Sequence, residues 1–100
     1  MAGAAALATG FYFVAGGRMI ACRNIRSLLE QSQNEAALQE ALQAVERFRE
    51  SAECHYLLAK AQRHVGHLNE ATEALSRADD LGWDANDLEF ERVLTIAQSG

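Results

Sequence analysis

The stretch that decides the fold is AECHYLLAKAQRHVGHLNEATEALSRADDLGWDA, residues 52–85. Up to Gly66, small and apolar side chains recur at the three- and four-residue spacings of one helix face, with charged side chains between them. Gly66 ends this helix. A second amphipathic pattern then runs from Asn69, a predicted N-cap, to the pair Leu81-Gly82, a predicted left-handed C-cap. Because so few residues separate the two helices, they must lie antiparallel in an αα-hairpin.

This hairpin resembles one unit of the tetratricopeptide repeat (TPR), a family built from helix-turn-helix units whose repeat length is about 34 residues. Counted from Ala52, the small and large positions of the family are met by Leu58, Ala59, Gly66, Leu68, Ala71, Leu75 and Ala78. Small side chains stand where the helices approach most closely, and leucines fill the gaps between them. The chain departs from the family pattern at His55, Gln62 and Trp83, where Trp, Tyr and Pro are usual. The resemblance implies an all-α fold of antiparallel helix-turn-helix repeats, a TPR-like α-solenoid, with residues 52–85 as one repeat.

The same register continues toward the N-terminus. Subtracting one repeat length from Ala71, Leu75 and Ala78 gives Ala37, Ala41 and Ala44. Residues 34–49 are therefore predicted to form the second helix of an earlier, degenerate repeat. That repeat covers residues 18–51, and its first helix lies around residues 19–31.

The register also continues toward the C-terminus, where adding one repeat length to Tyr56 gives Phe90. Residues 86–100 are predicted to form the first helix of an incomplete further repeat or a capping helix. Asn86 is its predicted N-cap, and Glu89 completes a capping-box-like pair. No partner helix follows, so we expect either a fragment of a longer repeat protein or a last helix that caps the array itself. Such a helix exposes apolar side chains and favours self-association.

Residues 1–17 form an apolar N-terminal segment without any charged side chain, closed by Arg18. Its length is at the lower limit of the roughly 17 to 25 residues that span a bilayer, which makes it a candidate transmembrane anchor. A helix packed on the following domain and a disordered tail are the alternatives. A cleaved signal peptide fits less well, because no basic residue precedes the apolar core. If the segment spans a membrane, the arginines after it place the repeats in the cytoplasm. Without an anchor we expect a cytoplasmic protein.

Composition limits the classes of function. The chain has 100 residues, 49% hydrophobic and 23% charged, without proline, which favours one small helical domain over a multidomain enzyme. Its net charge is −5, and the acidic excess lies after residue 33, so binding to nucleic acid is not expected. The two cysteines, Cys22 and Cys54, lie far apart in the sequence and are expected to be buried and reduced.

Neither a metal site nor a catalytic site is expected. Zinc would draw on Cys54, His55, His64 and His67. The last two histidines lie on opposite sides of the predicted turn, however, and no second ligand pair is present. The carboxylates between Asp79 and Glu91 do not fit a calcium loop and are expected to cap helices and form a solvated face. No nucleophile, phosphate-loop or dinucleotide motif occurs, so neither enzyme activity nor a cofactor is expected.

In the tetratricopeptide family, the first helices line a concave groove that holds a peptide or a partner helix. By resemblance, the residues that line the groove here are Glu53, Tyr56, Lys60, Arg63, His64, Asp87, Phe90 and Leu94. The aromatic residues would anchor a partner, and the basic residues would pair with its acidic groups. Family members that clamp a C-terminal carboxylate carry Lys and Asn where this chain has Tyr56 and Lys60, so that mode is not expected.

The resemblance therefore predicts a non-catalytic scaffold for protein-protein interaction, either free or tethered by residues 1–17. Two other interpretations remain open. In the first, the chain is an accessory membrane subunit whose N-terminal segment packs within a larger complex. In the second, it is a regulatory repeat region of a larger protein.

Overall fold

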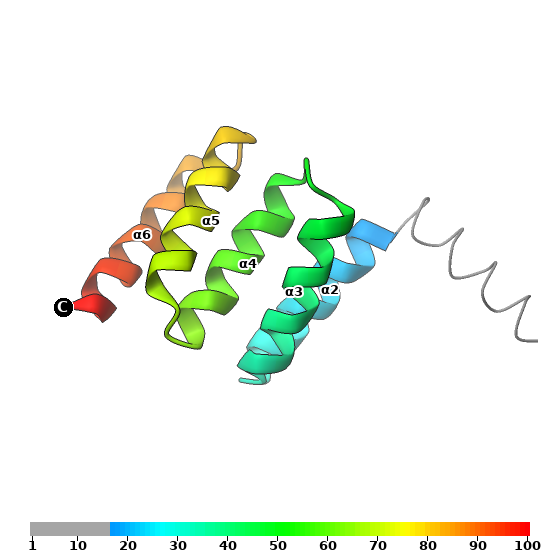
Figure 1. Ribbon diagram of the computed structural model, residues 1–100, viewed down its shortest axis with the longest axis horizontal. Helices are drawn as coiled ribbons and strands as arrows, with labels where there is room; N and C mark the ends of the chain where they lie inside the picture. The colour runs from blue at the N-terminus through cyan, green and yellow to red at the C-terminus, as the bar shows by residue number, and fades with distance from the viewer. Residues whose placement is uncertain (1–16) are drawn as a thin grey trace, which may run out of the picture.

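The computed structural model describes residues 17–100, which fold into five helices joined by short turns (Figure 1). The helices are α2 (Gly17–Glu30), α3 (Asn34–Arg47), α4 (Ala52–His64), α5 (Leu68–Asp80) and α6 (Ala85–Ser99). No strand occurs among these residues, so the described part of the chain is all-α, as the sequence predicts. The predicted helix around residues 19–31 begins and ends slightly earlier, and the predicted helix 34–49 ends two residues sooner, at Arg47.

The predicted membrane anchor lies outside the described residues, apart from Gly17, which begins α2. Within residues 17–100, no helix combines the length and the hydropathy needed to cross a bilayer.

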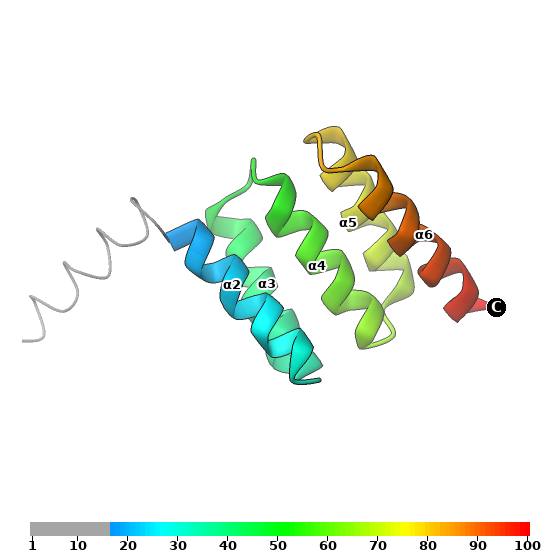
Figure 2. The same ribbon diagram turned by 180° about the vertical axis from the view of Figure 1, so that it is seen from behind.

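The five helices form two layers. Each helix runs antiparallel to the preceding one, with α2, α4 and α6 side by side in one layer and α3 and α5 in the other (Figures 1 and 2). α4 is the central element because it contacts each of the other four described helices.

Small side chains let the two layers approach closely. The buried face of α3 and α5 is mostly alanine: Ala37, Ala41, Ala44, Ala71, Ala74 and Ala78. Larger side chains from four different helices fill the remaining space, and Ile25, Leu57, Leu75 and Leu88 are each at most 1% exposed. This combination of small contact residues and interdigitating large ones is what close helix packing requires.

Left-handed turns end three of the helices. Gly66 and Gly82 have φ angles of 87° and 93°, a backbone conformation that glycine adopts without steric cost. The next residue in each case, His67 or Trp83, donates its backbone N–H to a carbonyl oxygen five residues earlier, at 2.8 Å and 3.0 Å. Ser32 makes the same turn with φ 58°. The predicted C-cap at Leu81-Gly82 is thus confirmed.

Two predicted N-caps are wrong. α5 begins at Leu68, and Ala71 already donates its N–H to the carbonyl oxygen of His67, so Asn69 lies inside the helix. The turn at Gly66 leads directly into the helix and leaves no room for a later cap. α6 begins at Ala85 because the side chain of Asp84 accepts a hydrogen bond from the backbone N–H of Asp87 at 2.9 Å. Asn86 therefore follows the cap instead of providing it.

Candidate functional site

The eight predicted groove residues come from α4 and α6, two of the three helices that share one layer (Figure 2). The residues predicted for helix packing lie in the α4-α5 hairpin. Among them, Leu58, Ala59, Ala71, Leu75 and Ala78 are at most 7% exposed. Leu68 is partly buried at the first position of α5, and Gly66 lies in the turn.

Tyr56 is enclosed by an aromatic partner, Trp83, which stands where the chain departs from the family pattern. The two rings stack, with centroids 5.1 Å apart and an interplanar angle of 25°. The ammonium of Lys60 lies 5.6 Å from the centre of the Tyr56 ring. Tyr56 is only 6% exposed, and this burial raises the pKa of its phenol to about 12. Its ring therefore belongs to the packing between α4 and the α5-α6 turn.

Ion pairs join neighbouring helices of the α2-α4-α6 layer. Glu53 of α4 accepts a hydrogen bond from Arg26 of α2 at 2.8 Å and lies 3.7 Å from Arg18. On the opposite side of α4, Arg63 Nε donates to Glu91 of α6 at 2.8 Å. Two predicted groove residues, Glu53 and Arg63, thus have partners within the chain.

Glu91 lies in the core, so the prediction of a solvated acidic face is wrong for this residue. Its side chain is 2% exposed, and both carboxylate oxygens face Arg63. A buried carboxylate is tolerated when a cation and hydrogen bonds compensate for its lost hydration. The signal that could have revealed it is the repeat register, because Glu91 stands one repeat length after the fully buried Leu57.

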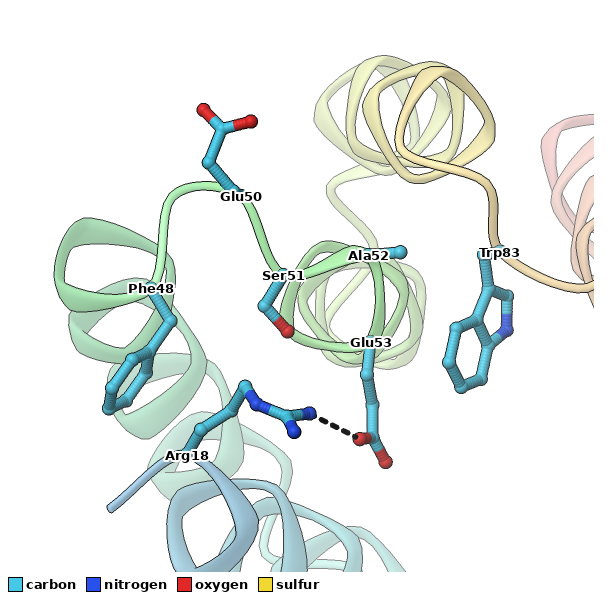
Figure 3. Close-up of a pocket in the computed structure, with 7 residues that line it drawn as sticks. All are labelled: Arg18, Phe48, Glu50, Ser51, Ala52, Glu53 and Trp83. Atoms are coloured by element: carbon cyan, nitrogen blue, oxygen red, sulfur yellow. Dashed lines mark ion pairs between the residues drawn. The ribbon is translucent and has the colours of Figure 1, made fainter. Parts of the chain in front are cut away.

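A cavity of about 500 Å³ opens at the N-terminal end of α4 (Figure 3). Its lining residues are Arg18, Phe48, Glu50, Ser51, Ala52, Glu53 and Trp83. Phe48 and Trp83 stand on opposite sides of the cavity, and the pair of Arg18 and Glu53 lies between them (Figure 3). Ser51 is engaged as the N-cap of α4, since its hydroxyl accepts the backbone N–H of Cys54. These lining residues offer aromatic surface and one ion pair, without a nucleophile beside a base.

α6 carries an exposed apolar strip. Phe90, Val93 and Ile96 are 63%, 53% and 70% exposed, and we call these three residues the α6 apolar face. Leu94, the other apolar groove residue on this helix, is partly buried.

The remaining polar candidates lie apart from one another. His64 is exposed at the end of α4, and partial desolvation together with the nearby Arg63 lowers its pKa. Asp87 is partly buried in the first turn of α6. His55 holds its Nε2 2.9 Å from the carbonyl oxygen of Arg49. In residues 17–100, no three His, Cys, Asp or Glu side chains come together in a group that could hold a metal ion.

One contact joins residues that the sequence places far apart. The sulfur atoms of Cys22 on α2 and Cys54 on α4 lie 3.7 Å from each other, and both cysteines are buried. The prediction that the two cysteines are buried is confirmed. Their contact was not foreseen, because it depends on how α2 packs against α4.

Comparisons of the chain with protein-family models, with curated proteins and with solved structures return no match.

Proposed function

We propose that this protein is a non-catalytic protein-protein interaction module of the tetratricopeptide type. The proposal is supported by burial that recurs with the repeat length of that family. On α3 and α5, the pairs Ala37 and Ala71, Ala41 and Leu75, and Ala44 and Ala78 are all buried. On α4 and α6, the same offset relates Cys54 to Leu88, Leu57 to Glu91 and Ala61 to Thr95, and all six are buried.

The observation that carries the proposal is a set of three positions at which the α6 side chains are exposed although the corresponding α4 side chains are buried. One repeat length before the α6 apolar face stand Tyr56, Ala59 and Gln62 of α4. These three residues are 6%, 1% and 8% exposed, because α5 and Trp83 pack against α4. The α6 apolar face is 53% to 70% exposed, and no described residue covers it. α6 thus presents to a partner the face that α4 buries within the chain.

The α4-α5 hairpin indicates the chemistry of the partner. α5 packs against α4, and its buried residues are Ala71, Ala74, Leu75 and Ala78, while its other face is polar. A partner for the α6 apolar face is therefore an amphipathic helix with a small apolar side that lies against Phe90, Val93 and Ile96. Helix-in-groove recognition of this kind uses anchors at three- and four-residue spacing.

The test is selection of helical peptides from a displayed library on the immobilised full chain, followed by affinity measurements with variants. Phe90→Ser and Ile96→Ser should each weaken binding of the selected peptides about tenfold or more, since each removes a large apolar contact. Leu42→Ser is the matched control, because Leu42 is an exposed apolar residue on α3, 40% exposed and outside the α6 face. Peptides that bind Phe90→Ser and Leu42→Ser equally well would contradict the proposal.

Tethering to a membrane by residues 1–17 is a separate proposal, based on the composition of that segment. Carbonate extraction of membranes from cells that make the full chain tests it. The full chain should stay in the pellet, and a chain without residues 1–16 should be released. Release of both would refute the tether and leave the interaction module unaffected.

A further inference from the structure

Cys22 and Cys54 are the only cysteines of the chain, and the fold brings their sulfur atoms to 3.7 Å. Cys22 is 3% exposed on α2 and Cys54 is 0% exposed on α4, although 32 residues separate them in the sequence. A disulfide bond needs a sulfur-sulfur distance of about 2.05 Å, so the two atoms must approach by roughly 1.7 Å. A shift of that size is within reach of side-chain rotation and a small movement of α2.

The surroundings of the pair favour the thiolate form at Cys54 more than at Cys22. Cys54 is the third residue of α4, and the positive end of a helix favours a thiolate there. The hydrogen bond between the two thiols is the main cause that lowers the pKa of Cys54 to about 7, and Ser51 contributes in the same direction while burial opposes both. The pKa of Cys22 is raised, because its proton is held in this hydrogen bond and the site is desolvated. The position of Cys54 at the start of α4 therefore favours its sulfur over that of Cys22 as the nucleophile.

A cavity of about 210 Å³ reaches Cys22 from the α2 side, and the sulfur of Cys54 lies 3.7 Å from that of Cys22. It is lined by Met19, Cys22, Arg23, Arg26 and Glu53. A small neutral oxidant such as hydrogen peroxide, close in size to a water molecule of about 30 Å³, fits into such a space. Larger disulfide reagents would need α2 to move away first.

We propose that Cys22 and Cys54 are an oxidation site, at which hydrogen peroxide converts the two thiols into a disulfide that joins α2 to α4. The Cys54 thiolate attacks one oxygen of the peroxide, the O–O bond breaks, and hydroxide leaves, which gives a sulfenic acid. The Cys22 sulfur then attacks the Cys54 sulfur, the S–O bond breaks, and the hydroxyl departs as water with the thiol proton. The two thiols lose two electrons in total, and the peroxide accepts them.

The disulfide would attach α2 covalently to α4 at one edge of the α2-α4-α6 layer. α2 is the outermost described helix of that layer, and the Arg26–Glu53 ion pair already bridges α2 and α4 close to the two sulfurs. A covalent link in this position closes a loop of about 30 residues that contains α3, and loops of this length restrict the unfolded chain strongly. Oxidation should therefore stabilise the fold without changing the arrangement of its helices.

The test begins with the reduced full chain, treated with hydrogen peroxide near neutral pH. Because the chain has only two cysteines, a monomer lighter by about 2 Da, the mass of two hydrogen atoms, can only contain the 22–54 disulfide. Trypsin without reductant should release residues 19–23 linked to residues 50–60. The midpoint of thermal unfolding should rise on the order of 10 °C, and dithiothreitol should reverse the change.

Cys22→Ala and Cys54→Ala are the matched variants, and circular dichroism establishes that each is folded. Because each variant lacks one of the two sulfurs, peroxide should produce the monomer lighter by about 2 Da from neither, and it should raise the midpoint of thermal unfolding of neither. A second measurement needs no variant. In glutathione redox buffers, the folded chain should reach half oxidation at a value of [GSH]²/[GSSG] at least tenfold higher than the same chain in concentrated urea. The reason is thermodynamic linkage: if the disulfide stabilises the fold, the fold stabilises the disulfide by the same free energy.

Three results would each overturn the proposal. The first is that peroxide yields only disulfide-linked dimers or singly oxidised cysteines. The second is that the oxidised monomer unfolds at a lower temperature than the reduced one. The third is that the folded and the urea-denatured chain reach half oxidation at the same value of [GSH]²/[GSSG].

Discussion

At the scale of single residues, the Arg63–Glu91 ion pair joins α4 to α6 where neither charge is well hydrated. The Arg63 side chain is 13% exposed and that of Glu91 2% exposed, and the guanidinium contacts both carboxylate oxygens. Loss of one member leaves the other charge buried without compensation, which costs far more than the pair itself contributes.

Arg63→Met should lower the free energy of unfolding by about 3 kcal/mol, measured by urea titration. The double variant Arg63→Met/Glu91→Leu should recover more than half of this loss, because leucine is the residue that α4 carries at the equivalent position, Leu57. Arg92→Met is the control, since Arg92 pairs with Asp79 at the surface and its removal should cost less than about 1 kcal/mol. Equal losses for Arg63→Met and Arg92→Met would contradict the argument.

Tyr56 makes stability depend on pH in the alkaline range. Burial raises the pKa of its phenol to about 12 in the folded chain, above the value of about 10 in the unfolded chain. The folded state therefore favours the neutral phenol. This contribution is fully present below pH 10 and is lost as pH rises toward 12, by at most about 2 kcal/mol.

Urea titrations of the native chain and of Tyr56→Phe at several pH values between about 9 and 12 measure this effect. The stability difference between the two proteins should shift in favour of Tyr56→Phe as pH rises. A constant difference would mean that the Tyr56 phenol ionises as readily in the folded chain as in the unfolded one.

At the scale of the helices, Ser32 stands where the next hairpin has Gly66, one repeat length later. Both residues adopt the left-handed conformation, with φ angles of 58° and 87°. A side chain in this conformation is strained by roughly 1 to 2 kcal/mol, part of which the entropy cost of glycine offsets. The turn after α2 thus keeps the shape of the turn after α4 with a less suitable residue.

Ser32→Gly should raise the free energy of unfolding by about 0.5 to 1 kcal/mol. Ser76→Gly is the control, because Ser76 is exposed inside α5, where glycine should destabilise by about 0.5 kcal/mol. Thermal unfolding of the two variants beside the native chain provides the measurement. A destabilising effect of Ser32→Gly would show that the serine side chain makes a favourable contact that outweighs the strain.

Helix number and turn positions could be predicted from the sequence because they depend on local patterns. Apolar spacing located the helices, and Gly66 and Gly82 located two of the turns. The N-caps could not be predicted as well. Asn69 and Asn86 are good capping residues, but each helix begins one residue earlier, at Leu68 and Ala85, because of the turn that precedes it.

At the scale of the whole molecule, the α6 apolar face affects the solution behaviour of the chain. Exposed apolar strips of this kind favour association between copies. Sedimentation velocity of the full chain should show mass rising with concentration. Phe90→Ser/Ile96→Ser should shift this association to at least tenfold higher concentration, and Leu42→Ser should leave it nearly unchanged. Association that the double serine variant does not weaken would place the contact elsewhere in the chain.

The candidate site was less predictable than the fold because its contacts are non-local. The resemblance to the tetratricopeptide repeat assigned Tyr56 and Arg63 to an open groove, and the structure pairs them with Trp83 and Glu91. These partners lie well beyond the α4-α5 turn in the sequence, so their contacts depend on how α6 and its preceding turn pack against α4. The meeting of two cysteines across α2 and α4 has the same origin.

The stack of Trp83 on Tyr56 also gives the molecule an optical property. Trp83 is the only tryptophan of the chain, so tryptophan fluorescence comes from a single known position, the turn between α5 and α6. Its emission should change when that turn separates from α4, whether or not α2 and α3 are still folded. Compared with circular dichroism, which averages over all the helices, this signal would reveal whether the two ends of the helix array come apart together or one before the other.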